Sequence, residues 1–344
     1  IRIYNPEDHA SSSRNNSNLS DNPNPTLIEN DHARAHLTWN GDQLTGIRHE
    51  GAVDAEIKYH WDGKKGYMEY PGGKAVIKND RHGRVLQRGE FLIHRNIVGQ
   101  VSAISSPNFL LVFHFDHHDR RIGETWRVWG KKVYEYYLTY KGEGKSSRIV
   151  GKTERYRGSS KKNFTYKYSP TGILTEVTRN LVEHETYAYD EKTRRIQSQI
   201  KNDPIRTYEY NRSDELKYAG NKEYIHDEKG FLQRISRLNG MRTNLKYWPN
   251  GQLSEVLLPD NTKITYALDA FGRRAMRSVD GHPQIYMLRD GLNKVLACYD
   301  GDHNLTHRFE YVGNRPLFLE HDGKRYYLIC DHLNSIRAIV GVDE

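Results

Sequence analysis

The chain has 344 residues, of which 36% are hydrophobic and 28% are charged, with a formal net charge of +8. The hydrophobic share lies below the range of about 45–50% usual for globular domains, so a dense core is not expected to fill this length. No block of five or more basic residues occurs, which argues against a nucleic-acid-binding tail, and no apolar run is long enough to span a membrane. Two cysteines exclude a disulfide-dense scaffold.

Residues 1–34 differ in composition from the rest of the chain. Ser11 to Pro25 is rich in Ser, Asn and Pro and cannot bury enough apolar surface to order itself. We therefore interpret 1–34 as a loop-rich entry segment. The chain begins with Ile1 and carries no signal peptide, so we expect it to be an internal part of a longer polypeptide.

From residue 35 onward the sequence predicts β-hairpins. An Asn or Asp directly before Gly is the strongest short-range hairpin signal, because both residues tolerate the positive φ angles of a type I′ turn. In the last third, turn glycines recur about every ten residues, which leaves room for one strand between turns. The eight dipeptides are Asn40-Gly41, Asp62-Gly63, Asn239-Gly240, Asn250-Gly251, Asp280-Gly281, Asp290-Gly291, Asp300-Gly301 and Asp322-Gly323.

A repeat of about 20 residues begins near residue 164. Each unit carries one or two tyrosines, then a turn, then an aliphatic strand; the defining residues are Tyr166, Tyr168, Tyr187, Tyr189, Asp190, Tyr208, Tyr210, Tyr247, Tyr266 and Tyr311. A hairpin of this length cannot bury its own face, so neighbouring units must stack. The chain has 24 Tyr against 9 Phe, which favours a single curved sheet that is wet on one side over a two-layer core.

The repeat resembles a known family. Tyr187-Ala188-Tyr189-Asp190 is similar to the YD repeat of the Rhs and teneurin families, and residues 326–338 resemble the segment at which Rhs shells finish, with Asn334 in place of the usual Gly. Residues 2–7 and 224–234 are similar to teneurin shell segments. The resemblance implies an all-β fold in which spiralling antiparallel hairpins over 35–344 form part of the wall of a large hollow barrel.

The resemblance also implies a function. It suggests an extracellular structural and adhesion scaffold of a teneurin-like, single-pass type II protein of the cell membrane, acting in trans-cellular recognition during neuronal development. Its implied partners are the rest of the same polypeptide's barrel, a second copy in a homodimer, and a latrophilin-type receptor or another teneurin; no nucleic-acid partner is expected. The alternatives are a bacterial Rhs or Tc-type cocoon that encapsulates a toxin, and a β-solenoid that binds carbohydrate or heparan.

Two clusters carry candidate chemistry. His114, Asp116 and His118 fall on one strand face, as zinc ligands would, but such clusters arise readily at turns of a chain with 17 His, so we interpret them as a solvated turn. Asp331-His332 and Ser335 suggest a nucleophile set, but no Gly-x-Ser-x-Gly elbow or phosphate-binding loop accompanies them. We therefore expect no enzyme activity, cofactor or metal.

Covalent modification is a further expectation. Five Asn-x-Ser/Thr sequons occur, at Asn15, Asn18, Asn163, Asn211 and Asn304, and all fall at predicted turns or loops where a glycan is tolerated. Cys298 and Cys330 are either a disulfide or two buried thiols. A ribbon cut from a barrel exposes unpaired strand edges, so residues 1–344 alone are expected to aggregate or to stay soluble only as oligomers.

Overall fold

The computed structural model describes residues 2–4, 24–62, 65–142 and 144–343, and it confirms the predicted all-β class. Apart from the 3-10 turn η2 (Gly144–Ser146), every regular element within these ranges is a β-strand. None of the described elements is a helix of the length and hydrophobicity needed to cross a membrane. The segment 1–34 contributes two short strands, and its residues 5–23, including Asn15 and Asn18, lie outside the described ranges.

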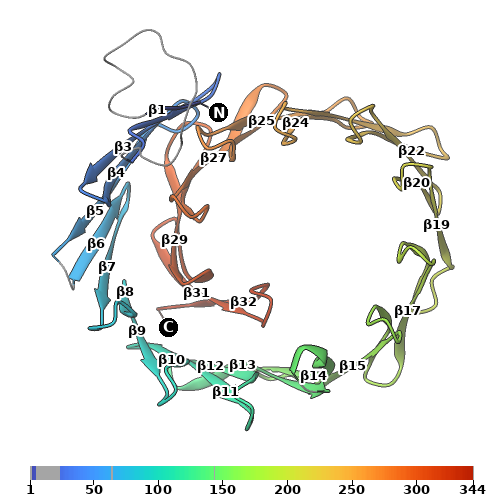
Figure 1. Ribbon diagram of the computed structural model, residues 1–344, viewed down its shortest axis with the longest axis horizontal. Helices are drawn as coiled ribbons and strands as arrows, with labels where there is room; N and C mark the ends of the chain where they lie inside the picture. Colours follow the sequence, from blue (N-terminus) through green and yellow to red (C-terminus); the bar gives the residue numbers. More distant parts are fainter. Residues whose placement is uncertain (1, 5–23, 63–64, 143, 344) are drawn as a thin grey trace. The chain divides into compact units, whose positions relative to one another are not determined.

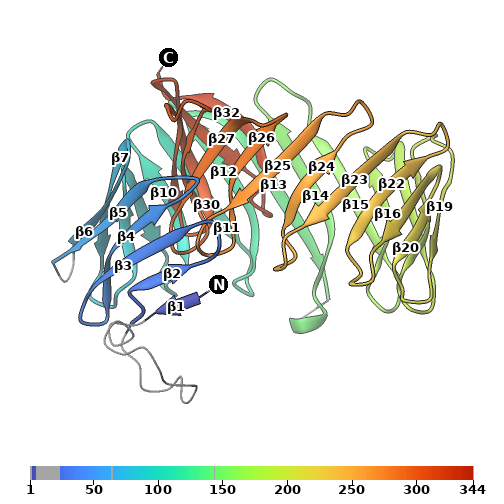
Figure 2. The same ribbon diagram turned by 90° about the horizontal axis from the view of Figure 1, so that it is seen from above.

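Strands that follow one another in the sequence pair antiparallel, which is the hairpin ribbon that the turn spacing predicted. The chain divides into two units, and the boundaries near residues 92, 244 and 328 fall inside strands rather than in linkers. Unit 1 takes the described residues up to Leu92 and Leu245–Leu328; unit 2 takes Ile93–Asn244 and Ile329–Val342. In each unit, successive strands lie side by side in chain order, as both Figure 1 and Figure 2 show.

The strands of unit 1, with those shared at its boundaries, are β1 (Arg2–Tyr4), β2 (Leu27–Glu29), β3 (Arg34–Asn40), β4 (Gln43–Glu50), β5 (Ala55–Trp61), β6 (Lys65–Tyr70), β7 (Gly73–Asn79), β8 (Val85–Arg88), β9 (Phe91–Arg95), β23 (Arg242–Tyr247), β24 (Leu253–Leu257), β25 (Lys263–Leu268), β26 (Arg274–Val279), β27 (His282–Arg289), β28 (Val295–Tyr299), β29 (Leu305–Val312), β30 (Arg315–His321) and β31 (Lys324–Cys330).

The strands of unit 2 are β10 (Val101–Ser106), β11 (Phe109–Phe115), β12 (Arg121–Val128), β13 (Lys131–Lys141), β14 (Arg148–Tyr156), β15 (Lys162–Tyr168), β16 (Leu174–Arg179), β17 (Glu183–Tyr189), β18 (Arg195–Ile200), β19 (Arg206–Tyr210), β20 (Leu216–Ala219), β21 (Lys222–His226), β22 (Leu232–Arg237) and β32 (Ile336–Gly341).

Unit 1 has two layers, which corrects the prediction of a single curved sheet for this part of the chain. The alternating strands β5 to β7 turn Ile57, Met68 and Ala75 to one face, where they meet Leu288 and other residues of β27 and β28 in one buried cluster. In Figure 1, β27 and β29 lie alongside the blue strands β4 to β7. The two sets of strands are more than 200 residues apart in sequence, so no local pattern signals that they meet.

Polar contacts fix the same two layers further along. Tyr70 donates its hydroxyl to the carbonyl oxygen of Phe309 at 3.4 Å. Arg308 on β29 forms ion pairs with Glu310 on the same strand and with Glu320 on β30, each at 2.7 Å. Gly89 has a φ of +57°, which favours glycine, and a Cβ there would displace the Glu310 carboxylate that packs against it.

Unit 2 has a core at one end only. β11 to β13 bury Phe109, Leu111, Trp126, Tyr134 and Tyr136, with the last four of these fully enclosed. Between residues 157 and 244, by contrast, only Thr178, Ser198 and Ala219 are buried. This part of the ribbon is the single, half-wet sheet that the tyrosine-rich composition predicted.

A five-residue turn, which we call the turn cassette, ends most of the repeats. Its first residue donates its N–H to the carbonyl of the fifth and accepts the N–H of the fourth, and the fourth residue always has positive φ. An Asp at the first position also accepts backbone N–H groups through Oδ1, as Asp190 does from Arg194, whose Nε binds Oδ2 at 2.7 Å. The cassettes start at residues 80, 96, 116, 169, 190, 211, 227, 237, 248, 258, 269, 290, 300 and 331.

Neighbouring cassettes are tied to each other. Lys192 and Arg194 of one cassette both bind the carboxylate of Asp214 in the next. In unit 1, Arg273 donates to the carbonyl of Asp290, one cassette further on, at 2.6 Å. These ion pairs and hydrogen bonds link neighbouring repeats, as expected if each repeat depends on its neighbours for stability.

The turn type predicted for the Asn-Gly and Asp-Gly dipeptides is correct at two of them only. Asp280-Gly281 and Asp322-Gly323 have positive φ at both residues, as a type I′ turn requires. Gly240 and Gly251 instead occupy the fourth position of cassettes, and Gly291 and Gly301 the second. Gly41 is the positive-φ residue of a two-residue loop, and Gly63 lies outside the described ranges. For the four dipeptides in cassettes the predicted turn type was wrong, because the cassette also accommodates Asp at its first position and Gly at its second or fourth.

The fourth cassette position offers a test of backbone strain. Thr193 is exposed there with a φ of +65°, where a β-branched residue is disfavoured. Thr193→Gly is expected to raise the free energy of unfolding by about 0.5–1 kcal/mol. The control is Thr207→Gly, at an exposed site inside β19, which is expected to lower stability. Urea unfolding that ranks the two variants in the opposite order would contradict the role of this position.

His49 makes the stability of unit 1 depend on pH. The ring is 5% exposed, and its Nε2 is buried without a hydrogen-bond partner. Burial lowers its pKa to about 4, with Asp269 and Arg273 as opposing secondary influences. The unfolded chain therefore binds the proton first, so stability is expected to fall by about 3 kcal/mol between pH 6.5 and 4.

The measurement is urea unfolding across this pH range. His49→Phe should flatten the pH dependence, whereas the exposed His82→Gln should leave it unchanged. Equal slopes for all three proteins would show that His49 is not the titrating group.

Candidate functional site: a buried ionic cluster under the C-terminal segment

Residues 329–342, which we call the C-terminal segment, belong to unit 2 and pack onto the end that has a core. Ile329, Cys330 and Asp331 are fully buried, and Val342 is nearly so. The ring of His332 lies 5.6 Å from the ring of Tyr136 on β13. The segment therefore covers the aromatic face of β12 and β13.

Charged side chains gather at this contact, and we call Glu124, Lys152, Glu154, Asp331 and Arg337 the ionic cluster. The first four are buried, whereas the side chain of Arg337 is 38% exposed. Lys152 and Glu154 are about 5% exposed and form an ion pair at 2.7 Å, which Tyr134 joins with a hydrogen bond of 3.2 Å to Glu154. On the segment, Arg337 binds Asp331 at 2.6 Å. Glu124, which is fully buried, accepts the indole N–H of Trp126 at 3.1 Å.

The electrostatics link the two sides of this contact. Burial alone would lower the pKa of Arg337, but its hydrogen bond to Asp331 and the charges of Asp331 and Glu154 raise it. Burial would raise the pKa of Asp331, yet the hydrogen bonds from Arg337 and from the N–H groups of Leu333 and Ser335 hold it below its usual value. Asp331 thus stays ionised, and its pairing with the partly exposed Arg337 helps to hold the segment.

Burial lowers the pKa of His332, and its Nδ1 is enclosed without a hydrogen bond. The candidate nucleophile set does not assemble around this neutral ring. Asp331 is the first residue of a cassette and spends Oδ1 on the N–H groups of Leu333 and Ser335, while Ser335 itself is exposed. Both oxygens of the carboxylate are therefore hydrogen-bonded, Oδ1 to the two N–H groups and Oδ2 to Arg337. The three residues do not have the arrangement of a catalytic triad.

The candidate zinc ligands are engaged separately. His114 bonds through Nε2 to Thr125 at 2.8 Å, and Asp116 is the first residue of a cassette with Arg120 at 2.7 Å. The ring of His118 lies tilted against that of His117, with 3.9 Å between ring centroids. No cluster of three metal-ligating side chains is found in the described part of the chain.

Cys298 in unit 1 and Cys330 in unit 2 are both buried. Burial raises the pKa of Cys298 to about 11, which keeps that thiol protonated at neutral pH.

The repeat-defining tyrosines are all half-buried, as a wall that is wet on one side requires. The second tyrosine of a pair reaches back to the preceding strand: Tyr168 donates to the carbonyl of Ile149 at 2.7 Å, and Tyr210 to that of Arg195 at 2.9 Å. Neighbouring side chains contact three of the others: Tyr187 bonds Glu185, Tyr208 bonds Ser198, and Arg274 lies over the ring of Tyr266. Burial raises the pKa of Tyr166 and of Tyr311 to about 12. Tyr189 and Tyr247 directly precede cassettes.

The described sequons differ in how their side chains are used. Asn163 is exposed on β15, so it lies in a strand and not in the predicted turn, and its side-chain nitrogen makes no hydrogen bond. Asn211 is the first residue of a cassette and binds Glu215 through Nδ2 at 2.7 Å. Asn304 closes another cassette and donates to Asp300 at 3.1 Å.

Lys152, Glu154 and Glu124 are the residues that sequence reasoning missed. Charged residues in a strand ordinarily face water, so nothing in their type suggested burial. The only available signal is that residues 152 and 154 share one face of β14, which matters only once the C-terminal segment is known to cover that face.

Comparison with known proteins bears on this architecture. The sequence matches the family Teneurin YD-shell over residues 34–344. Similar solved structures are TcdB2-TccC3-TEV (11% identity, TM-score 0.46, covering 92% of this chain and 22% of that chain) and TcdB2-TccC3-Cdc42 (10%, 0.43, 90% and 23%). A third is TcdB2-TccC3 without its hypervariable C-terminal region (12%, 0.39, 93% and 24%).

This chain thus corresponds to less than a quarter of the length of each of these structures. No curated protein matches the sequence. The family match covers nine-tenths of the chain and includes the YD repeat, the turn cassettes and the C-terminal segment. The chain belongs to the teneurin YD-shell family.

Proposed function

We propose that this shell segment is an extracellular adhesion scaffold without catalytic activity. The observation that carries the proposal is the match to the teneurin shell over residues 34–344, which excludes only the entry segment. The tied cassettes and the ionic cluster suit a stiff wall, because each repeat is braced by its neighbours. In this proposal the scaffold belongs to a single-pass type II protein of the cell membrane and recognises a partner on another cell.

The partner we propose is a latrophilin-type receptor or another teneurin, with a homodimer on the same cell. The test displays the chain on one cell population and a latrophilin-type ectodomain or a second copy of the chain on another. The expected result is mixed aggregates that soluble chain inhibits. Separate populations in both pairings, with correct surface display, would overturn the adhesive role while leaving the shell fold untouched.

A second candidate is a cocoon that encapsulates a toxin, favoured by the resemblance of residues 326–338 to the end of Rhs shells. The two candidates differ in the sequence that the gene encodes downstream of Glu344. An aspartyl self-cleavage motif and then a toxin domain would support the cocoon. A continuation without that motif would favour the adhesion scaffold.

Passage through the secretory pathway predicts a specific glycosylation pattern. Asn163 is expected to carry a glycan, because it is exposed and its Nδ2 is available. Asn211 is expected to stay unmodified, because its side-chain nitrogen and oxygen are both hydrogen-bonded inside the cassette that it begins. The measurement is glycopeptide mass spectrometry of secreted protein, with Asn163→Gln as the control for peptide assignment. A sugar on Asn211 together with a bare Asn163 would contradict this prediction.

A further inference from the structure

Two histidines of unit 1 lie side by side on β29 and β30. His307 and His321 are directly opposite each other in the register of these strands, so both side chains extend from the same face of the sheet. Their rings are nearly parallel, with 4.2 Å between the centroids and 19° between the planes. The side chain of His321 is 43% exposed, which leaves the pair open to solvent.

One residue orients both rings. Thr306 is the extra residue of a β-bulge between β28 and β29, and a bulged residue is left out of the regular ladder. Its hydroxyl donates to the carbonyl of Cys298 at 3.1 Å and therefore accepts the Nδ1–H of His307 at 2.9 Å. Its carbonyl accepts the Nδ1–H of His321 at 3.1 Å.

These hydrogen bonds fix the tautomer of each ring. A neutral imidazole that carries its proton on Nδ1 has a lone pair on Nε2. Because both rings turn Nδ1 toward Thr306 and are nearly parallel, their two Nε2 lone pairs point away from it on the same side. Histidines that bind a metal are held in this way, by a hydrogen bond from the nitrogen that does not bind the metal.

A carboxylate adds negative charge beside the pair. Oδ2 of Asp322 lies 3.4 Å from Nε2 of His321. When the ring is neutral both atoms are acceptors, so their approach favours a cation beside them. A single proton satisfies one of the two Nε2 atoms, whereas one metal ion binds both.

We propose that His307 and His321 bind a divalent transition-metal ion, Zn²⁺ or Cu²⁺, through their Nε2 atoms. Imidazole is a preferred ligand of these ions, whereas Ca²⁺ and Mg²⁺ prefer oxygen. Metal–nitrogen bonds of about 2.0–2.1 Å place the two nitrogens roughly 3 Å apart, which stacked rings reach by a small rotation. Water completes the coordination, in keeping with the lack of a three-residue cluster among the described residues. The site is independent of the adhesive partner proposed above.

The experiment titrates the full chain with Zn²⁺ in a calorimeter and with Cu²⁺ under electron paramagnetic resonance, which reports the number of bound nitrogens. His321→Gln removes one of the two ligands. It is expected to weaken Zn²⁺ binding about 100-fold or more, because even a lost hydrogen bond to a metal-binding histidine costs about 10–100-fold. Thr306→Val removes only the hydroxyl that orients His307 and is expected to weaken binding about tenfold.

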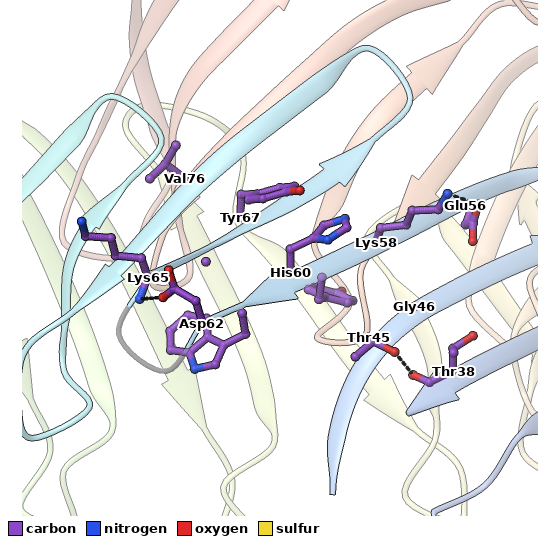
Figure 3. Close-up of a pocket in the computed structure, with 13 residues that line it drawn as sticks. Thr38, Thr45, Gly46, Glu56, Lys58, His60, Asp62, Lys65, Tyr67 and Val76 are labelled. Carbon is purple, nitrogen blue, oxygen red and sulfur yellow. Dashed lines mark hydrogen bonds and ion pairs between the residues drawn. The ribbon is translucent and has the colours of Figure 1, made fainter. Parts of the chain in front are cut away.

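His60 provides the matched control. Like His321, its side chain is 43% exposed and its ring lies nearly parallel to that of a cross-strand neighbour, at 4.2 Å and 19°. It also contacts a carboxylate, that of Glu69 at 3.5 Å. Its neighbour is Tyr67, as Figure 3 shows, so this place offers one imidazole only. His60→Gln should therefore leave the Zn²⁺ affinity unchanged.

Binding of the metal must also stabilise unit 1, because only the folded chain brings the two nitrogens together. Zn²⁺ is expected to raise the urea midpoint of the parent protein and of His60→Gln, but not that of His321→Gln. The proposal is overturned if the parent chain binds neither ion at millimolar concentration, if binding survives His321→Gln, or if bound Cu²⁺ has fewer than two nitrogen ligands. An equal loss in His60→Gln would likewise replace it with unspecific binding by exposed histidines.

Discussion

Arg337→Leu is expected to lower the free energy of unfolding of unit 2 by about 2 kcal/mol. The substitution removes the cation that neutralises Asp331, a carboxylate whose side chain is only 1% exposed, and so leaves a buried charge without its partner. Two backbone N–H groups still bind the other carboxylate oxygen, and the Arg337 side chain is itself 38% exposed, so the loss stays below the range of about 3–5 kcal/mol for fully buried pairs. Urea unfolding followed by tyrosine fluorescence measures the loss.

Two further variants make this result specific. Arg325→Leu removes an exposed arginine that approaches Asp343 only at 3.9 Å, and it should change stability by less than about 0.5 kcal/mol. Asp331→Asn added to Arg337→Leu should restore part of the loss, because a neutral amide can be buried at lower cost. A loss of the same size in Arg325→Leu, or no recovery in the double variant, would show that the ionic cluster does not hold the segment.

The same pair predicts a pH dependence with a definite sign. The folded-state pKa of Asp331 lies below its usual value, despite burial, because Arg337 and two N–H groups stabilise the ionised form. Its contribution is therefore present above the unfolded pKa of about 4 and is lost as the pH falls through the folded value. The stability difference between the parent protein and Arg337→Leu should shrink accordingly in acid.

Leu288→Ala is the second large expected effect, at about 3 kcal/mol. Leu288 is 1% exposed and belongs to the buried cluster in which β27 and β28 cover β5 to β7. The control is Leu292→Ala, four residues away and 76% exposed in a cassette, which should cost less than about 0.5 kcal/mol. Thermal or urea unfolding compares the pair.

Equal and small losses in the two variants would mean that β27 and β28 do not pack as a layer against β5 to β7. Equal and large losses would instead indicate that the cassette at residue 290 bears on stability through its side chains. The difference between the two leucines is thus the quantity that reports on the two-layer packing of unit 1.

The repeat itself could be predicted because its signals are local. A tyrosine directly before an Asp, followed by a residue that tolerates positive φ, marks a cassette wherever it occurs, and Asn334 takes over the role of the usual Gly with a φ of +62°. The spacing of about 20 residues then gives one hairpin per unit. The detailed turn conformation was less accessible, since Asp-Gly suits both a type I′ turn and the start of a cassette.

The layers and the ionic cluster could not be predicted because they depend on contacts between distant parts of the chain. Ile57 and Leu288 each look like an ordinary apolar strand residue, and only the fold places both in one cluster. Lys152 and Glu154 look like solvated strand residues until the C-terminal segment covers them. The low hydrophobic content was consistent with the half-wet sheet of residues 157–244 but gave no sign of these two enclosed regions.

Native-state hydrogen exchange of the full chain, followed by mass spectrometry at increasing urea, tests most directly whether the repeats depend on one another. If neighbouring cassettes and back-reaching tyrosines brace the wall, the amides of β15 to β22 should become exchangeable together, with one shared dependence on urea. Hairpins such as β17–β18 and β21–β22 that open separately, each at its own urea concentration, would contradict this mutual dependence.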